Sequence, residues 1–65
     1  MKYYTLYRPP MTGAIPRGQT SICAFDERRF IPEIGKAAWG YAVYDRELTD
    51  DEIYEYELAK ENRNV

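Results

Sequence analysis

The sequence predicts a small α+β domain in which a three- to four-stranded, mainly antiparallel sheet carries one C-terminal helix packed on it. Two observations predict this fold: an alternating aromatic stretch over residues 37–44 and a helix-capping motif that begins at Thr49. A chain of 65 residues has the length of one domain, so residues 1–65 are expected to fold as a single domain. Because so short a chain buries only about 60 % of its unfolded surface, aromatic residues are the expected source of its core.

The stretch 37–44 is expected to be the central strand. Trp39, Tyr41 and Val43 are spaced by two and therefore share one face of a pleated strand. The other face carries alanines and a glycine, which leave room for a helix to pack closely. Only one face takes the helix, so a core list drawn from both faces cannot be right in full. The predicted core consists of Leu6, Ile22, Ala24, Trp39, Tyr41, Val43, Ile53, Tyr54 and Leu58.

The stretch 2–8 is rich in tyrosine and is expected to form a strand that pairs with 37–44. Pro9 and Pro10 end this strand, because a prolyl nitrogen has no hydrogen to donate. Residues 9–19 hold three prolines and two glycines and are predicted to form a loop. This loop is unusually apolar, so it either folds back on the sheet or presents an apolar ridge to a partner.

Residues 20–25 are predicted to form a second strand. The charged residues 26–29 are expected to turn the chain, and Phe30-Ile31 to return as a short strand, so that 20–31 forms a short hairpin. A second tight turn is expected over residues 32–35.

The last third of the chain holds the most specific local signal. Thr49 followed three residues later by Glu52 makes a capping box, which predicts a helix from Asp50 to about Lys60. The tail 61–65 is expected to fray. The helical residues expected on the sheet are Ile53, Tyr54 and Leu58.

The residue types present argue against an enzyme. The chain has one cysteine, Cys23, and no histidine, so an internal disulfide, a Cys/His zinc site and a Cys/His catalytic dyad are all excluded. It has no glycine-rich phosphate loop. The neighbouring acidic residues Asp50 and Asp51 are explained by helix capping. We therefore expect no catalytic residue, no cofactor and no metal.

The sequence predicts a cytoplasmic protein without a membrane partner. It contains no run of about 20 apolar residues that would span a membrane, and its N-terminus has no signal-peptide core. A single unpaired cysteine suits a reducing compartment.

The leading functional hypothesis is a non-enzymatic interaction protein that binds another protein. The loop 9–18 and the neighbouring aromatics are its expected contact surface, and self-association into a homodimer is a further option for so small a domain. The predicted protein-binding residues are Met11, Ile15, Arg17, Tyr3 and Tyr7.

The alternative hypothesis is a nucleic-acid-binding accessory protein that uses basic and aromatic residues of the sheet. Its predicted contact residues are Lys2, Arg8, Arg17, Arg28 and Arg29. Residues 1–44 carry six basic and three acidic groups, whereas residues 45–65 carry three basic and eight acidic ones. Binders of nucleic acid are usually more basic, and the acidic segment could instead imitate its phosphates. The alternative requires the five basic residues to share one face.

Two long stretches carry a resemblance to known proteins. Residues 3–18 (YYTLYRPPMTGAIPRG) and 38–49 (AWGYAVYDRELT), together with Tyr56-Glu57-Leu58, resemble short proteins of conjugative and prophage elements in Gram-positive gut bacteria. Some of those proteins are labelled as related to defence against restriction. The resemblance implies a mobile-element setting and an accessory role against host defences. It assigns no activity to any residue of this chain.

Overall fold

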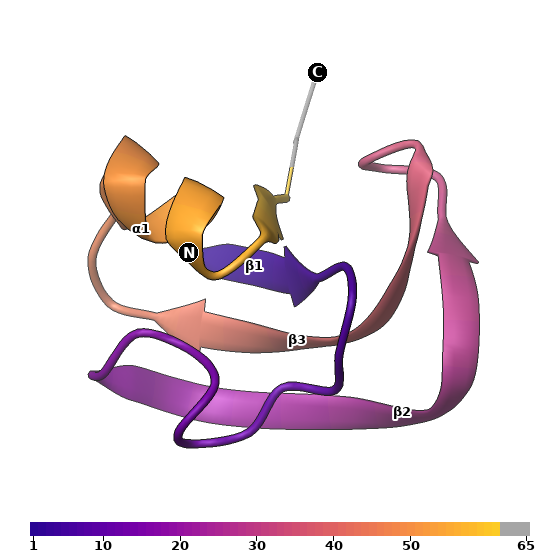
Figure 1. The fold of residues 1–65 in the computed structure, drawn as a ribbon, viewed down its shortest axis with the longest axis horizontal. Coiled ribbons are helices and arrows are strands. Elements are labelled where there is room, and N and C mark those ends of the chain that lie inside the picture. The colour runs from indigo at the N-terminus through magenta and orange to yellow at the C-terminus, as the bar shows by residue number, and fades with distance from the viewer. Residues whose placement is uncertain (62–65) are drawn as a thin grey trace.

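The structure is a computed structural model that describes residues 1–61, and its elements are four strands and one short helix (Figure 1). All pairings in the sheet are antiparallel, and the strand order is β2-β3-β1-β4. The predicted α+β class is confirmed, with strands dominating. The helix within residues 1–61 is too short and too polar to cross a membrane. The elements are β1 (Lys2–Thr5), β2 (Gln19–Ile31), β3 (Lys36–Tyr44), α1 (Asp50–Glu55) and β4 (Leu58–Lys60).

The N-terminal strand β1 lies inside the sheet, between β3 and β4. Its predicted pairing with the central strand is confirmed, with Tyr3 opposite Ala42. On its other side Tyr3 lies opposite Lys60 of β4. The buried Thr5 hydroxyl donates to the carbonyl of Gly40, so its polar group is satisfied inside the sheet.

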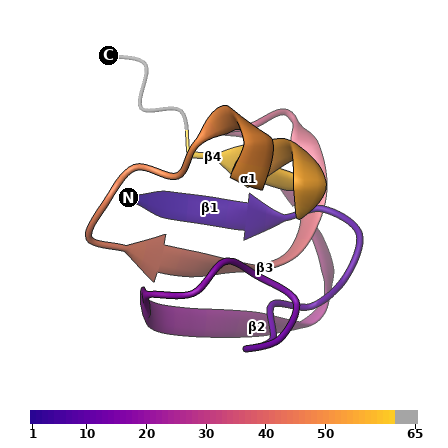
Figure 2. The same cartoon turned by 60° about the vertical axis from the view of Figure 1, so that its left-hand side comes forward.

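The core lies on the face of β3 that carries the small side chains. Loop 6–18 crosses this face, and α1 packs beside β4 (Figures 1 and 2). Trp39, Tyr41 and Val43 lie on the other face and are only half-buried, so their place in the predicted core is wrong. The buried cluster consists of Tyr3, Ile15, Ala42, Tyr44, Leu48 and Leu58, with Ile22, Ile53 and Tyr56 packed against it.

A close approach by the loop explains why the small face is the buried one. A Cβ atom built on Gly40 would lie 2.7 Å from Cδ and 2.8 Å from Cγ of Pro10, and would also clash with the carbonyl oxygen of Cys23. Only glycine fits this gap between β2 and the loop. Leu6 and Leu58 are buried as predicted, whereas Ala24 is exposed.

The helix is shorter than the sequence predicts. Its capping box is confirmed: the amide of Glu52 donates to Oγ1 of Thr49, and the amide of Thr49 donates to a Glu52 carboxylate oxygen. The helix ends at Glu55, and Glu57 then adopts a left-handed φ of 55°. This residue reverses the chain and delivers Leu58 to the sheet.

Two further predictions depend on that early helix end. Tyr54 is 87 % exposed, so its predicted place on the sheet is wrong. Glu61 was expected to fray, but its amide donates to the carbonyl of Lys2 beside β4. The rest of the predicted tail, residues 62–65, lies outside the described residues.

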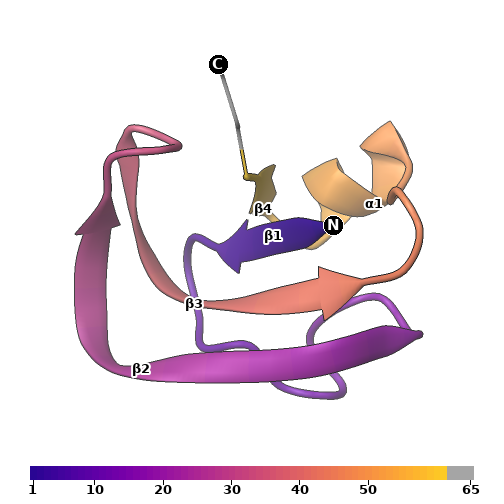
Figure 3. The same ribbon diagram turned by 180° about the vertical axis from the view of Figure 1, so that it is seen from behind.

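Residues 20–31 belong to one strand and not to a hairpin. Ala24 lies opposite Gly40 and Arg29 opposite Ala38, so four residues of β2 face the single residue Trp39 of β3. The charged segment predicted as a turn is therefore a bulge, and the β2–β3 hairpin bends sharply there (Figures 1 and 3). The predicted turn over residues 32–35 is confirmed, since it joins β2 to β3.

Candidate interaction surfaces

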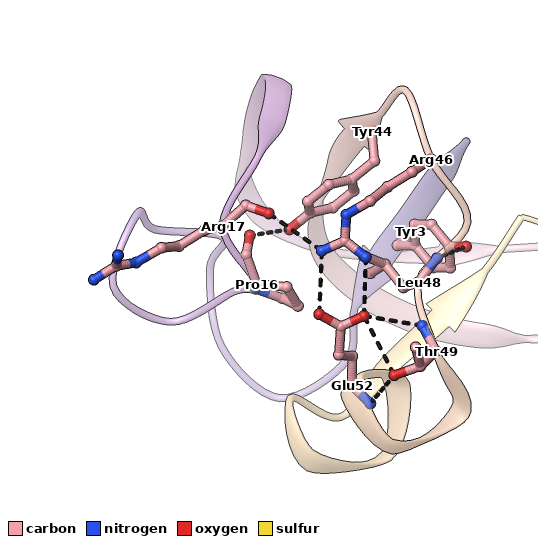
Figure 4. A network of polar contacts seen from close by, with 8 residues as sticks. All are labelled: Tyr3, Pro16, Arg17, Tyr44, Arg46, Leu48, Thr49 and Glu52. Atoms are coloured by element: carbon pink, nitrogen blue, oxygen red, sulfur yellow. Dashed lines mark hydrogen bonds and ion pairs between the residues drawn. The ribbon is translucent and has the colours of Figure 1, made fainter.

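Two buried tyrosine hydroxyls anchor the loop and the helix entry to the sheet (Figure 4). The Tyr44 hydroxyl donates to the carbonyl of Pro16 at 2.6 Å, and the Tyr3 hydroxyl accepts from the amide of Leu48 at 2.9 Å. The two rings meet edge to face with their centroids 5.9 Å apart. Burial raises the pKa of Tyr44 to about 12. These contacts hold loop 6–18 and the segment before α1 in fixed positions.

A second set of polar contacts ties α1 to the same loop (Figure 4). The Arg46 guanidinium donates to both carboxylate oxygens of Glu52 at 3.1 Å, and also donates to the carbonyl of Arg17 at 3.4 Å. The hydrogen bonds from Arg46, and next the one from the Thr49 amide, lower the pKa of Glu52 to about 2. Arg46 and Glu52 thus connect α1 to loop 6–18.

An open hollow in the surface of the domain has a volume of about 790 Å³. It is bordered by α1, by β4 and by the start of β3. Two exposed aromatic side chains line it: Tyr7 is 65 % exposed and Tyr54 is 87 % exposed. We call it the tyrosine groove; its lining residues are Tyr7, Lys36, Asp50, Ile53, Tyr54, Glu55, Glu57 and Leu58.

The tyrosine groove is acidic. Three carboxylates line it against one ammonium group, that of Lys36. Glu57 pairs with Arg8 at 2.8 Å, whereas Asp50 and Glu55 form no ion pair within residues 1–61. Two carboxylates on α1 therefore line the groove without an ion-pair partner within residues 1–61.

The predicted protein-binding residues do not form one patch. Tyr3 is fully buried and Ile15 is 3 % exposed, so neither is available to a partner in this fold. Tyr7 lines the tyrosine groove. Met11 and Arg17 are exposed on the loop, where Arg17 borders a second hollow of about 620 Å³ that is separate from the groove.

The face of the sheet opposite the core gathers aromatic rings and two cations. The ring of Tyr41 meets those of Tyr4 and Phe25 edge to face, at centroid distances of 5.9 and 6.1 Å. Lys2 Nζ lies 4.5 Å from the centroid of Tyr41, and the Arg29 guanidinium lies 5.1 Å from that of Phe25. We call this set the aromatic–cation face.

The five predicted nucleic-acid contacts do not share one face. Lys2 and Arg29 belong to the aromatic–cation face, and Arg28 is exposed in the neighbouring bulge. Arg8 is paired with Glu57 beside the tyrosine groove, and Arg17 lies on the loop across the core face. Of the five side chains, Lys2 and Arg29 thus lie on the same face, each over one ring of the Tyr41–Phe25 pair.

The residue that sequence reasoning missed most clearly is Tyr54. The spacing of four between Tyr54 and Leu58 suggests one helical face, but that inference requires the helix to continue through Leu58. The helix ends at Glu55, and the residue that then turns the chain, Glu57, is neither glycine nor asparagine, so no residue type marks the turn. The tyrosine groove therefore has no clear sequence signal.

Comparison with models of protein families gives a match. The family model described as "Defence against restriction A C-terminal" matches residues 1–63, which is nearly the whole chain. Neither the curated proteins nor the solved structures gave a match. The resemblance to proteins labelled as defence-against-restriction related is confirmed, and the chain belongs to the Defence against restriction A C-terminal family.

Proposed function

We propose that this domain is a non-enzymatic interaction module with an accessory role in defence against restriction, and that it binds another protein through the tyrosine groove. The family supports the defence role and, with it, an association with a phage or another mobile element. The observation that carries the binding site is the pair of exposed tyrosines that line one hollow. Tyrosine is among the residues that contribute most to protein interfaces.

The contacts that fix α1 support the same proposal. α1 is fixed at its start by the capping box and by the Arg46–Glu52 pair. A side chain presented by a fixed element loses less entropy on binding than one on a mobile loop. Tyr54 projects from this short helix at 87 % exposure, so it is presented on a fixed support.

The test is a pull-down with the tagged domain from a host lysate, with and without nuclease. The wild-type domain is compared with the double variant Tyr7→Ala/Tyr54→Ala and with Phe30→Ala. Phe30 is the matched control, because it is 65 % exposed and lies outside the groove. We expect a discrete protein that survives nuclease, is retained by Phe30→Ala and is lost from the double variant. A partner captured equally by all three proteins would place binding elsewhere and contradict the proposal.

The aromatic–cation face favours a second candidate function, binding of single-stranded nucleic acid. Its specific support is the location of Lys2 and Arg29 against rings of the sheet. It ranks second because those cations already cover the rings on which bases would stack. The variant Arg28→Glu/Arg29→Glu should abolish binding of a single-stranded oligothymidylate in a fluorescence anisotropy titration if this function is present. Unchanged binding by that variant would argue against it.

A further inference from the structure

We infer that the occupant of the tyrosine groove is an extended, basic segment of a partner protein, in which lysine or arginine alternates with apolar side chains. This inference rests on the proposed function, because it names the chemistry of the segment that the same groove would bind. It draws on three properties of the groove: its excess of carboxylates, its aromatic sides and its apolar floor.

The charge of the groove predicts that the bound segment of the partner is positively charged. Asp50 and Glu55 line it and have no ion pair within residues 1–61. Glu57 is shared with Arg8 in a pair that is substantially exposed, so a partner cation can compete for it. A concave surface with an excess of one sign of charge concentrates the opposite sign. A phosphate-bearing ligand would be repelled by the same carboxylates.

The aromatic sides suit cations as well as apolar groups. The ring of tyrosine attracts a guanidinium or ammonium group placed over its face, and this attraction is worth about 0.5–1 kcal/mol at exposed sites. Tyr7 and Tyr54 are the two aromatic residues among those that line the groove, and both are exposed. Each can therefore contact the aliphatic stem and the charged end of one lysine or arginine.

The floor of the groove supplies the apolar part of the recognition. Leu58 is 6 % exposed and Ile53 is half-buried, and both line the hollow. An extended segment directs alternate side chains to opposite sides. Apolar side chains can then face Ile53 and Leu58 while the basic ones between them reach the carboxylates at the rim.

Lys36 makes the charge of the groove differ between its two sides. It lines the hollow from the start of β3, whereas Asp50 and Glu55 line it from α1. The charge is thus acidic on the helix side and basic on the hairpin side. The basic residues of the partner are expected to lie against α1.

The inference is tested with short fluorescein-labelled peptides of about twelve residues, a length that suits an extended recognition segment. One peptide alternates lysine and leucine, a second alternates glutamate and leucine, and a third alternates lysine and glycine. Fluorescence anisotropy gives the affinity of each for the wild-type domain. We expect only the lysine–leucine peptide to bind strongly, with an affinity that falls as salt rises from about 50 to about 200 mM.

Matched variants distinguish binding in the groove from nonspecific electrostatic attraction. Glu55→Lys should weaken the lysine–leucine peptide by about tenfold or more, whereas Glu27→Lys, an equal charge change at an exposed bulge residue, should have little effect. Tyr54→Ala should weaken it by a similar factor, whereas Phe30→Ala should not. Circular dichroism and thermal unfolding establish that each variant is folded.

Three results would overturn the inference: no binding of the lysine–leucine peptide, equal weakening by Glu55→Lys and Glu27→Lys, or tighter binding of the glutamate–leucine peptide. These results are distinguishable from failure of the proposed function. If a partner from the lysate depends on Tyr7 and Tyr54 but the lysine–leucine peptide does not bind, the groove remains the binding site. The basic segment is then excluded as its occupant.

Discussion

The two faces of β3 differ in a way that side-chain size alone would not suggest. The face with Ala38, Ala42 and Tyr44 is buried, and the hydroxyl of Tyr44 is satisfied there by the carbonyl of Pro16. The opposite face carries Trp39 and Tyr41, which remain half-buried. Burial therefore follows the segments that cross a face and not the bulk of the side chains on it.

The comparison teaches that each face is stabilised by different chemistry. The small-residue face is closed by the backbone and side chains of loop 6–18, which approach the sheet closely at Gly40. The aromatic–cation face is closed by its own edge-to-face ring contacts and by Lys2 and Arg29. Tyr4 of the second face is buried, but Tyr41 and Phe25 are half-buried and Arg29 is exposed. Loss of one contact should therefore cost much on the first face and little at these three residues of the second.

The largest expected effect is that of Gly40→Ala. The added methyl group would meet the Pro10 ring and the backbone of Cys23, so either the loop or β2 must move. We expect a loss of about 3 kcal/mol or more in the free energy of unfolding, measured by urea denaturation. Gly13→Ala is the control, because a Cβ atom there meets no described atom within 4 Å. Equal effects at the two positions would contradict the close approach of the loop.

The next effect compares one hydroxyl on each face. Tyr44→Phe leaves the buried carbonyl of Pro16 without its donor and should cost about 1–2 kcal/mol. Tyr41→Phe removes a hydroxyl that makes no hydrogen bond within residues 1–61, and should change stability by less than about 0.5 kcal/mol. Chemical denaturation of both variants measures the difference. A larger loss at Tyr41 would reverse the proposed contrast between the faces.

The same contrast predicts a dependence on alkaline pH. The pKa of Tyr44 is about 12 in the folded domain and about 10 in the unfolded chain, so the folded state retains a proton that the unfolded state releases. Stability should therefore be unaffected by this group below pH 10 and should fall as the pH rises from about 10 toward about 12. Denaturation at several pH values measures the slope. Tyr44→Phe should flatten it, and an unchanged slope in this variant would assign the effect to other groups.

The smallest effect is expected on the aromatic–cation face. Arg29→Met keeps an unbranched apolar side chain over Phe25 but removes the charge, and should cost about 0.5 kcal/mol. Thermal unfolding at low and high salt gives the measurement. Arg28→Met in the adjacent bulge is the matched control. A loss of several kcal/mol at Arg29 would show that this face is as tightly closed as the core.

Local signals in the sequence predicted the parts of the fold that depend on neighbouring residues. Thr49 and Glu52 mark the helix start by themselves, and the alternation over residues 37–44 marks the central strand. The choice of buried face could not be predicted in this way. It depends on Pro10 and Ile15, which are far from β3 in the sequence and meet it only through the path of the loop.

The candidate site was less predictable than the fold for a similar reason. Tyr7 was expected at a contact surface, and the structure leaves it exposed in the tyrosine groove. Tyr54 became its counterpart only because the helix ends early and β4 returns the chain to β1. Ile15, by contrast, is an apolar loop residue that packs into the core. The sequence alone did not decide between packing and binding for this loop.

The central position of β1 has a consequence for the synthesis of the chain. Tyr3 pairs with Ala42 and with Lys60, so its partners lie 39 and 57 positions further along. During translation the first strand is made long before either neighbour and exposes two unpaired edges until they arrive. Such distant pairings slow folding, and unpaired edges promote aggregation. The nascent chain is therefore most vulnerable at Lys2–Thr5, the segment that ends up best protected in the folded domain.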